Sequence, residues 1–71
     1  MNSNEPRIAH ADRLLKLKDV MALTSLGSST IYRRMDAGTF PSPKVLSAGC
    51  VRWRESDIEQ WMTDLPTRGA A

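Results

Sequence analysis

The chain has 71 residues, of which 41% are hydrophobic and 25% charged, and its formal net charge is +2. Such a length allows one domain with little core, which argues against the closed pocket of an enzyme or of a small-molecule receptor. One cysteine and one histidine allow neither an internal disulfide nor a zinc site, and no apolar run resembles a signal peptide or a membrane span. We therefore expect a reduced, cytoplasmic protein without metal, cofactor or membrane contact.

The two ends of the chain differ from its middle. Residues 1–12 are polar, contain Pro6 and lack a hydrophobic period, so they predict a flexible N-terminal arm. Residues 66–71 predict a flexible C-terminal tail in the same way. The folded domain is then expected over residues 13–65.

The first predicted helix runs from about Lys18 to Leu23, and the preceding "LLKL" is compatible with a short strand. The apolar residues that mark this helix are Leu17, Val20, Met21 and Leu23. Thr24, Ser25 and Gly27 are poor helix-interior residues, so only a tight turn separates this helix from the next.

The second predicted helix begins at Gly27 or Ser28, either of which can serve as N-cap, and ends at Gly38, which can adopt the left-handed conformation. At about 100° per residue its side chains divide between two faces. The inner face holds Ile31, Arg34 and Met35, and the outer face holds Ser29, Tyr32, Arg33 and Asp36. The outer face is rich in groups that can form hydrogen bonds.

A hairpin is predicted next, because Pro41 and Pro43 exclude a helix and the β-prone runs "KVL" and "CVRW" are separated by Ser47, Ala48 and Gly49. Alternation along the second run puts two side chains toward the core and two toward solvent. The inward pair is Val51 and Trp53, and the outward pair is Arg52 and Arg54.

The third predicted helix has the clearest period, with Ile58, Trp61, Met62 and Leu65 on one stripe. Ser56 and Glu59 match a capping box at its start, and Pro66 marks its end. The order of elements predicts a mainly α fold with a small β-hairpin, a winged helix-turn-helix, with a possible strand in front.

Three stretches, "LKDVMALTSL", "STIYRRMDAGTFPSPKVLS" and "VRWRESDIEQWM", together resemble the AlpA family of phage-type transcriptional regulators, within the wider group of MerR-like and excisionase domains. The resemblance covers residues 14–62. It implies a small DNA-binding protein of a prophage or integrated element that activates an integrase gene or directs excision. It also implies a recognition helix over residues 28–37 and a wing around residues 47–50.

The N-terminal residues of a recognition helix reach base edges in the major groove, and an arginine there can bind guanine with two hydrogen bonds. Arg33 is our candidate for this role, and its alternative is a solvated surface charge. Arg34 lies nearer the core and is expected to pair with an acidic group or a phosphate. Tyr32 binds a phosphate or packs against the hairpin. The candidates on this helix are Ser28, Ser29, Thr30, Tyr32, Arg33 and Arg34.

The hairpin offers Lys44, Ser47, Arg52 and Arg54 as candidate contacts to the DNA backbone, and the alternative is an ordinary solvated β-face. Arg54 has a second alternative, which is to fix the entry to the third helix.

The remaining reactive side chains favour structural roles. Trp53 and Trp61 are expected in the core, Cys50 half-buried in the hairpin, and His10 in solvent. Asp57 and Glu59 are explained by the helix start, and no catalytic triad or metal set accompanies them, so an enzyme is rejected.

The sequence thus predicts a transcriptional regulator that binds double-stranded DNA, together with further copies of itself on repeated sites because one small module buries little DNA surface. No small-molecule ligand is expected. Two alternatives stay open: an excisionase that bends DNA for recombination, and a protein-interaction module that has lost DNA binding. The low charge and the neutral "SAGC" at the hairpin tip motivate the second alternative.

Overall fold

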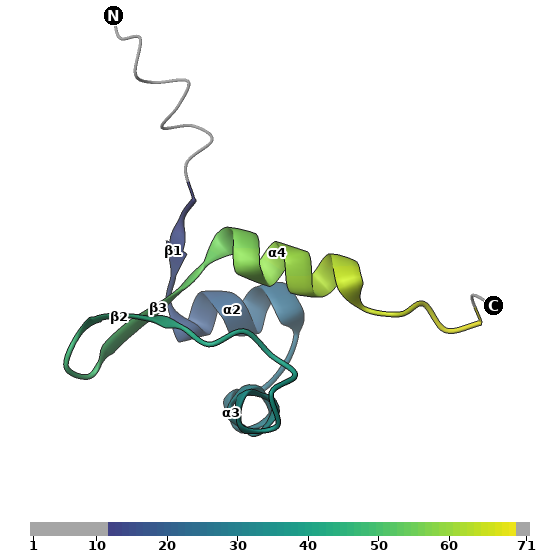
Figure 1. Cartoon of the computed structure of the whole chain (residues 1–71), viewed down its shortest axis with the longest axis horizontal. Helices are drawn as coiled ribbons and strands as arrows, with labels where there is room; N and C mark the ends of the chain where they lie inside the picture. The colour runs from purple at the N-terminus through teal and green to yellow at the C-terminus, as the bar shows by residue number, and fades with distance from the viewer. Residues whose placement is uncertain (1–11, 70–71) are drawn as a thin grey trace, which may run out of the picture.

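The computed structural model describes residues 12–69, which form three helices and one three-stranded antiparallel sheet (Figure 1). The elements in chain order are β1 (Leu14–Leu15), α2 (Leu17–Thr24), α3 (Ser28–Asp36), β2 (Lys44–Ser47), β3 (Cys50–Arg54) and α4 (Glu55–Asp64). This is a winged helix-turn-helix, as predicted: α2 and α3 form the helix pair, and β2 with β3 forms the wing. The predictions for the N-terminal arm through residue 11, including His10, and for residues 70–71 lie outside the described residues.

The sheet is larger than the predicted hairpin, because the strand expected in front joins it. β3 is the central strand, and Leu15 of β1 lies opposite Trp53. The turn between β2 and β3 is Ala48 and Gly49, so Ser47 belongs to the strand and not to the turn. Gly49 has φ 73°, a left-handed conformation that glycine adopts without steric cost.

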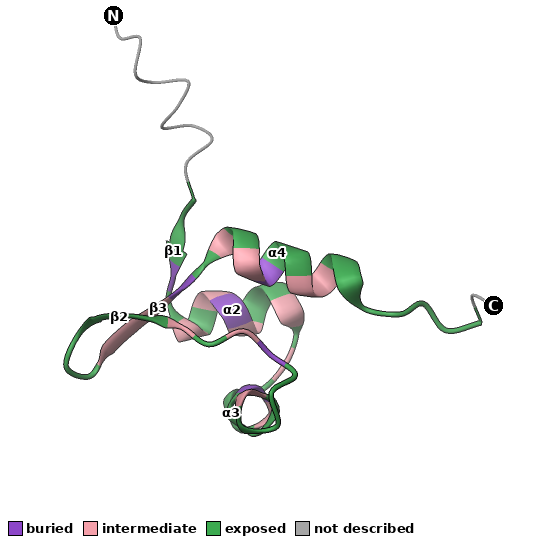
Figure 2. Ribbon diagram, in the orientation of Figure 1, coloured by how far each residue is buried: buried purple, intermediate pink, exposed green. Residues whose placement is uncertain are grey.

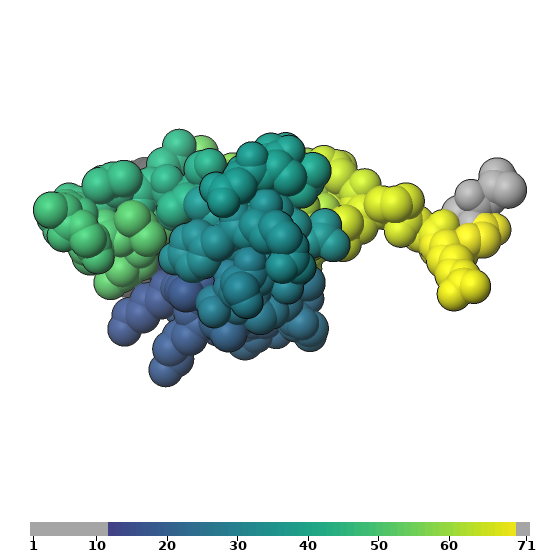
Figure 3. All heavy atoms as spheres, turned by 90° about the horizontal axis from the view of Figure 1, so that it is seen from below, coloured from purple at the N-terminus to yellow at the C-terminus, as the bar shows by residue number. Residues whose placement is uncertain are grey.

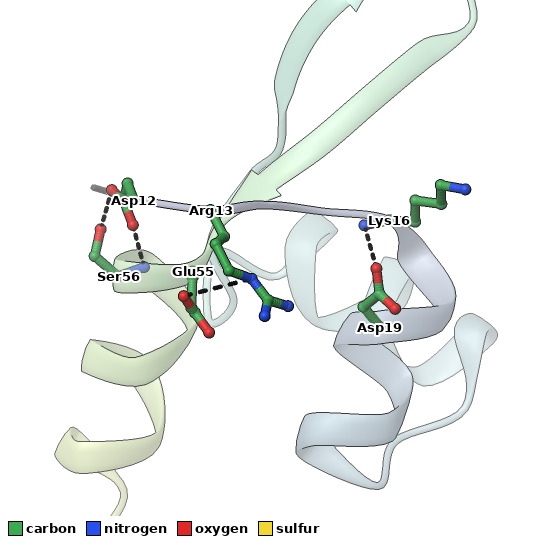
Figure 4. Close-up of polar contacts among 6 residues, drawn as sticks. All are labelled: Asp12, Arg13, Lys16, Asp19, Glu55 and Ser56. Atoms are coloured by element: carbon green, nitrogen blue, oxygen red, sulfur yellow. Dashed lines mark hydrogen bonds and ion pairs between the residues drawn. The ribbon is translucent and has the colours of Figure 1, made fainter. Parts of the chain in front are cut away.

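The helix pair follows the prediction closely. α2 is held at its start by the Asp19 carboxylate, which accepts the backbone N–H of Lys16 at 3.0 Å (Figure 4). Ser25 ends it with φ 61°, and Gly27 is the N-cap of α3, as predicted. Leu23 is the exception, because it is 46% exposed and contributes little to the core.

Every helix, β1 and β3 each contribute one fully buried side chain to the core, and the segment between α3 and β2 contributes Phe40. Figure 2 shows these buried positions where the elements meet. The Trp53 ring is fully buried, as predicted, and its Nε1 donates a hydrogen bond to the carbonyl of Pro41 at 2.9 Å. Trp61 is only half-buried, so its assignment to the core was partly wrong. The buried set is Leu15, Val20, Ile31, Phe40, Trp53 and Ile58.

The start and end of α4 differ from the prediction. The helix begins at Glu55, so Ser56 lies inside it and the Ser56–Glu59 capping box is wrong. The Ser56 N–H and hydroxyl instead both donate to the carboxylate of Asp12, at 2.8 Å and 2.6 Å (Figure 4). Leu65 lies beyond the last helical residue in an extended conformation and is 46% exposed, so it does not extend the buried stripe.

Candidate nucleic-acid interface

α3 is anchored to the core through one fully buried residue, Ile31, and its opposite, outer face is free of the core. Ser28 and Ser29 are exposed at its first turn, which contains no acidic residue. In the view from below, α3 forms the front of the molecule and the hairpin extends to one side of it (Figure 3). A helix end with free backbone N–H groups and no carboxylate is suited to anionic partners.

Arg33 lies on this outer face, as its spacing predicts, and is exposed. Its Nη2 donates to the hydroxyl of Thr30, one turn earlier, at 3.4 Å. The guanidinium is therefore directed along the helix toward its N-terminal half. Thr30 itself is half-buried, so its hydroxyl serves this contact at the edge of the outer face.

Arg34 is exposed, although its spacing places it on the predicted inner face with Ile31 and Met35. The apolar stripe of α3 is narrow, because only Ile31 is fully buried and Met35 is half-buried. The Arg34 carbonyl accepts the backbone N–H of Thr39 at 2.8 Å and its hydroxyl at 3.2 Å, so the Arg34 backbone takes part in the turn that ends the helix. Tyr32 is 44% exposed, so its ring is not packed away against the hairpin.

The hairpin carries two of its predicted cations close together. Lys44 pairs with Arg52 across β2 and β3, which puts both side chains on one face of the sheet. Lys44 and Ser47 are exposed, whereas Arg52 is half-buried and donates from Nη1 to the carbonyl of Val51 at 2.7 Å. Cys50 is half-buried, as predicted.

Arg54 has a structural partner. Its Nε donates to Oδ2 of Asp12 at 2.7 Å, and this contact raises the pKa of Arg54. Hydrogen bonds from Ser56 lower the pKa of Asp12, with a further contribution from Arg54. Of the two alternatives for Arg54, the one that fixes the entry to α4 describes what the structure contains.

Asp12 was missed by sequence reasoning, which placed it in the flexible arm. It joins β1 to the start of α4 by capping the helix from 44 residues away in the chain. The neighbouring Arg13 supports the same junction, because its carbonyl accepts the Glu55 N–H at 2.8 Å and its Nε lies 3.8 Å from the Glu55 carboxylate (Figure 4). No local sequence pattern signals contacts of such separation.

An open hollow of about 430 Å³ lies between the segment after α3 and the outer side of α4. The hollow is open to solvent and is not the closed pocket that the short chain argues against. Its lining residues are Gly38, Thr39, Phe40, Pro41, Asp57, Gln60, Trp61 and Asp64.

Residues 12–69 lack the features of two other kinds of site, a membrane span and a metal centre. None of the helices there has the length and apolar content needed to cross a bilayer. The same residues contain no group of three or more histidine, cysteine or acidic side chains that could hold a metal ion.

Comparison with known proteins agrees with this fold. The family described as "Prophage CP4-57 regulatory protein (AlpA)" matches residues 13–65. A protein of Enterobacteria phage P4, "Uncharacterized protein ORF88", is 37% identical over 51 residues, which cover 72% of this chain and only 58% of the phage protein. The "DNA-binding transcriptional activator AlpA" of Escherichia coli (strain K12) is 35% identical over 60 residues, which cover 75% of this chain and 84% of that protein. No solved structure matches the chain.

Proposed function

Because the chain belongs to the AlpA family of prophage regulatory proteins, we propose that it is a sequence-specific, DNA-binding transcriptional regulator of a prophage or mobile element. The observation that carries the proposal is that α3 exposes Arg33 on its outer face, exposes the neighbouring Arg34 as well, and has no carboxylate in its first turn. A similar protein of Escherichia coli is named as a DNA-binding activator, which supports the same function.

In this proposal α3 enters the major groove with its first half against the base edges. Arg33 donates two hydrogen bonds to a guanine, a contact that contributes about 1–3 kcal/mol of discrimination against other bases. The contact with Thr30 at 3.4 Å is long enough to be exchanged for a base edge at little cost. Ser28 and Ser29 bind phosphate or base edges beside it.

The hairpin lies along the DNA backbone. Lys44 and Arg52, which share one face of the sheet, neutralise phosphates, and Ser47 at the end of β2 donates a hydrogen bond. Arg54 acts indirectly in this proposal, because its bond to Asp12 ties the end of β3 to the segment before β1. Arg34 contributes a phosphate contact without base preference.

A single module of this size buries roughly 600–1,000 Å² on DNA, which is too little for high specificity. We therefore expect several copies on repeated sites. Sedimentation of the protein on a long DNA fragment tests this point, and strict one-to-one binding at saturation would contradict it.

The decisive experiment is a fluorescence-anisotropy titration with DNA from upstream of the protein's own gene and with a scrambled duplex, at two salt concentrations. Arg33→Ala is compared with Arg34→Ala, which removes the same charge from the same helix. We expect Arg33→Ala to abolish the preference for the native DNA, and Arg34→Ala to weaken binding to both duplexes alike and lower the salt dependence. Equal, weak and salt-sensitive binding of the parent protein to both duplexes would contradict sequence-specific recognition.

A further inference from the structure

The hollow beside α4 combines aromatic rings with carboxylates. Its aromatic part is formed by Phe40 and Trp61, and its acidic part by Asp57 and Asp64. The two parts come from different elements: Phe40 lies in the segment that leads from α3 to the wing, and the other three residues lie on α4. Their meeting is therefore a product of the tertiary structure.

Hydrogen bonds hold the walls of the hollow in place. The Trp61 indole Nε1 donates to the carbonyl of Thr39 at 2.8 Å, which fixes the ring against the segment after α3. The Phe40 ring is buried and meets Trp61 edge to face, with ring centroids 4.7 Å apart. The Gln60 amide donates to the Asp64 carboxylate at 2.8 Å. The site thus needs little ordering when a ligand binds.

The charge of α4 decides what kind of ligand suits this site. The helix carries Glu55, Asp57, Glu59 and Asp64 and has no lysine or arginine. Four carboxylates repel phosphates, so the hollow does not suit nucleic acid. Glu55 lies near Arg13, and Asp57 is close enough to Arg54 to help raise its pKa. Asp64 has no ion pair within residues 12–69, and the only hydrogen bond of its side chain there is the one from Gln60.

We propose that this hollow binds an arginine side chain of a partner protein. The guanidinium is planar, so it stacks on the exposed part of the Trp61 ring while its N–H groups donate to Asp64. Asp57, which also lines the hollow, adds negative potential. Arginine suits the site better than lysine because lysine lacks the planar group that stacks on a ring.

The position of the hollow lets the protein bind DNA and the partner together. Gly38 and Thr39 place the hollow at the C-terminal end of α3, whereas the proposed base contacts lie in the first half of that helix. α4 and α3 lie on opposite sides of α2 (Figure 1). One arginine contact is weak, so it would form one anchor of a larger contact with a basic segment of the partner.

The test is a heteronuclear NMR titration of the full chain with a blocked Gly-Arg-Gly tripeptide. A tripeptide in which neutral citrulline replaces arginine is the matched probe. We expect saturable shifts of the Trp61 indole N–H and of the Thr39 and Gln60 signals with the arginine peptide, at dissociation constants on the order of 1–10 mM. The citrulline peptide should give no saturable shift.

Asp64→Asn separates this site from general surface charge, because the amide keeps an oxygen that can accept from Gln60. It should weaken binding of the arginine peptide by about two- to fivefold. Asp36→Asn, which removes an exposed carboxylate on α3, should change nothing at the hollow. Both variants should still bind DNA, so failure here is distinct from failure of the proposed function. Equal shifts with both peptides, or unchanged affinity in Asp64→Asn, would overturn the proposal.

Discussion

α3 and α4 are helices of nearly equal length, 9 and 10 residues, with opposite charge. α3 carries Arg33 and Arg34 against Asp36, a net charge of +1, and α4 carries four carboxylates and no cation, a net charge of −4. The formal net charge of +2 for the whole chain therefore does not reveal that positive and negative charge lie on different helices. A small net charge is compatible with a DNA-binding face when the acidic residues lie elsewhere.

The two helices also differ in how they are held. The N-cap of α3 is Gly27, which has no side chain to cap the helix, so the first N–H groups of α3 remain open to a ligand. The first turn of α4 is occupied by the Asp12 carboxylate, and its first N–H is bonded to Arg13. The helix proposed to read DNA thus keeps its donors available, and the helix that braces the fold uses them internally.

Trp53→Ala tests the hydrophobic core against which both helices pack. Of the changes considered, it should lower the stability of the fold the most. Removing a fully buried tryptophan costs about 3–5 kcal/mol of unfolding free energy, a large share of the total stability of a domain this small. We expect circular dichroism to show a mostly unfolded chain at 37 °C. Val45→Ala, at a residue that is 72% exposed, is the control and should melt like the parent.

Reversing the charge of α3 tests whether the separation of charge matters for DNA. Arg33→Glu with Arg34→Glu changes the net charge of α3 from +1 to −3 and leaves the core untouched. DNA affinity at low salt should fall on the order of 100-fold, measured by anisotropy, while the melting curve stays similar. The single control Glu59→Lys, on the acidic helix, should alter DNA affinity by much less. A comparable effect of both variants would show that total charge, not its placement, governs binding.

Asp12→Asn sharpens the contrast in how the helices are held. We expect faster amide hydrogen exchange in the first turn of α4 and unchanged exchange in α3, because only α4 uses this carboxylate. The melting temperature should fall by a few degrees. Asp36→Asn serves as the matched control, and uniform acceleration of exchange across both helices would contradict a local role for Asp12.

Lowering the pH should weaken the same Asp12 contacts with the start of α4, with a smaller effect on stability than the substitution. The pKa of Asp12 is lowered in the fold, so its contribution to stability is present above the unfolded pKa of about 4 and is lost as pH falls through the folded value. The difference in melting temperature between the parent and Asp12→Asn should therefore shrink as pH falls from about 7 to about 3. A constant difference over this range would show that the Asp12 charge contributes nothing.

The sequence alone determined the order of elements, because each follows from a local pattern. The inner faces around Ile31, Trp53 and Ile58 are set by the helical and strand periods, and all three residues are buried. The turns at Ser25, Gly38 and Gly49 have positive φ, as the predicted breaks between elements require. Arg33 was placed on the outer face of α3 by spacing alone.

Only the tertiary structure decided how the ends of these elements are completed. Asp12 replaced the expected Ser56 capping box because its carboxylate, in the segment before β1, accepts an N–H of the first turn of α4. Phe40 packs against Trp61 without burying it, so an expected core residue became part of the wall of a hollow. Local patterns fix which side of an element is apolar, but contacts between residues far apart in the chain depend on where the folded elements meet.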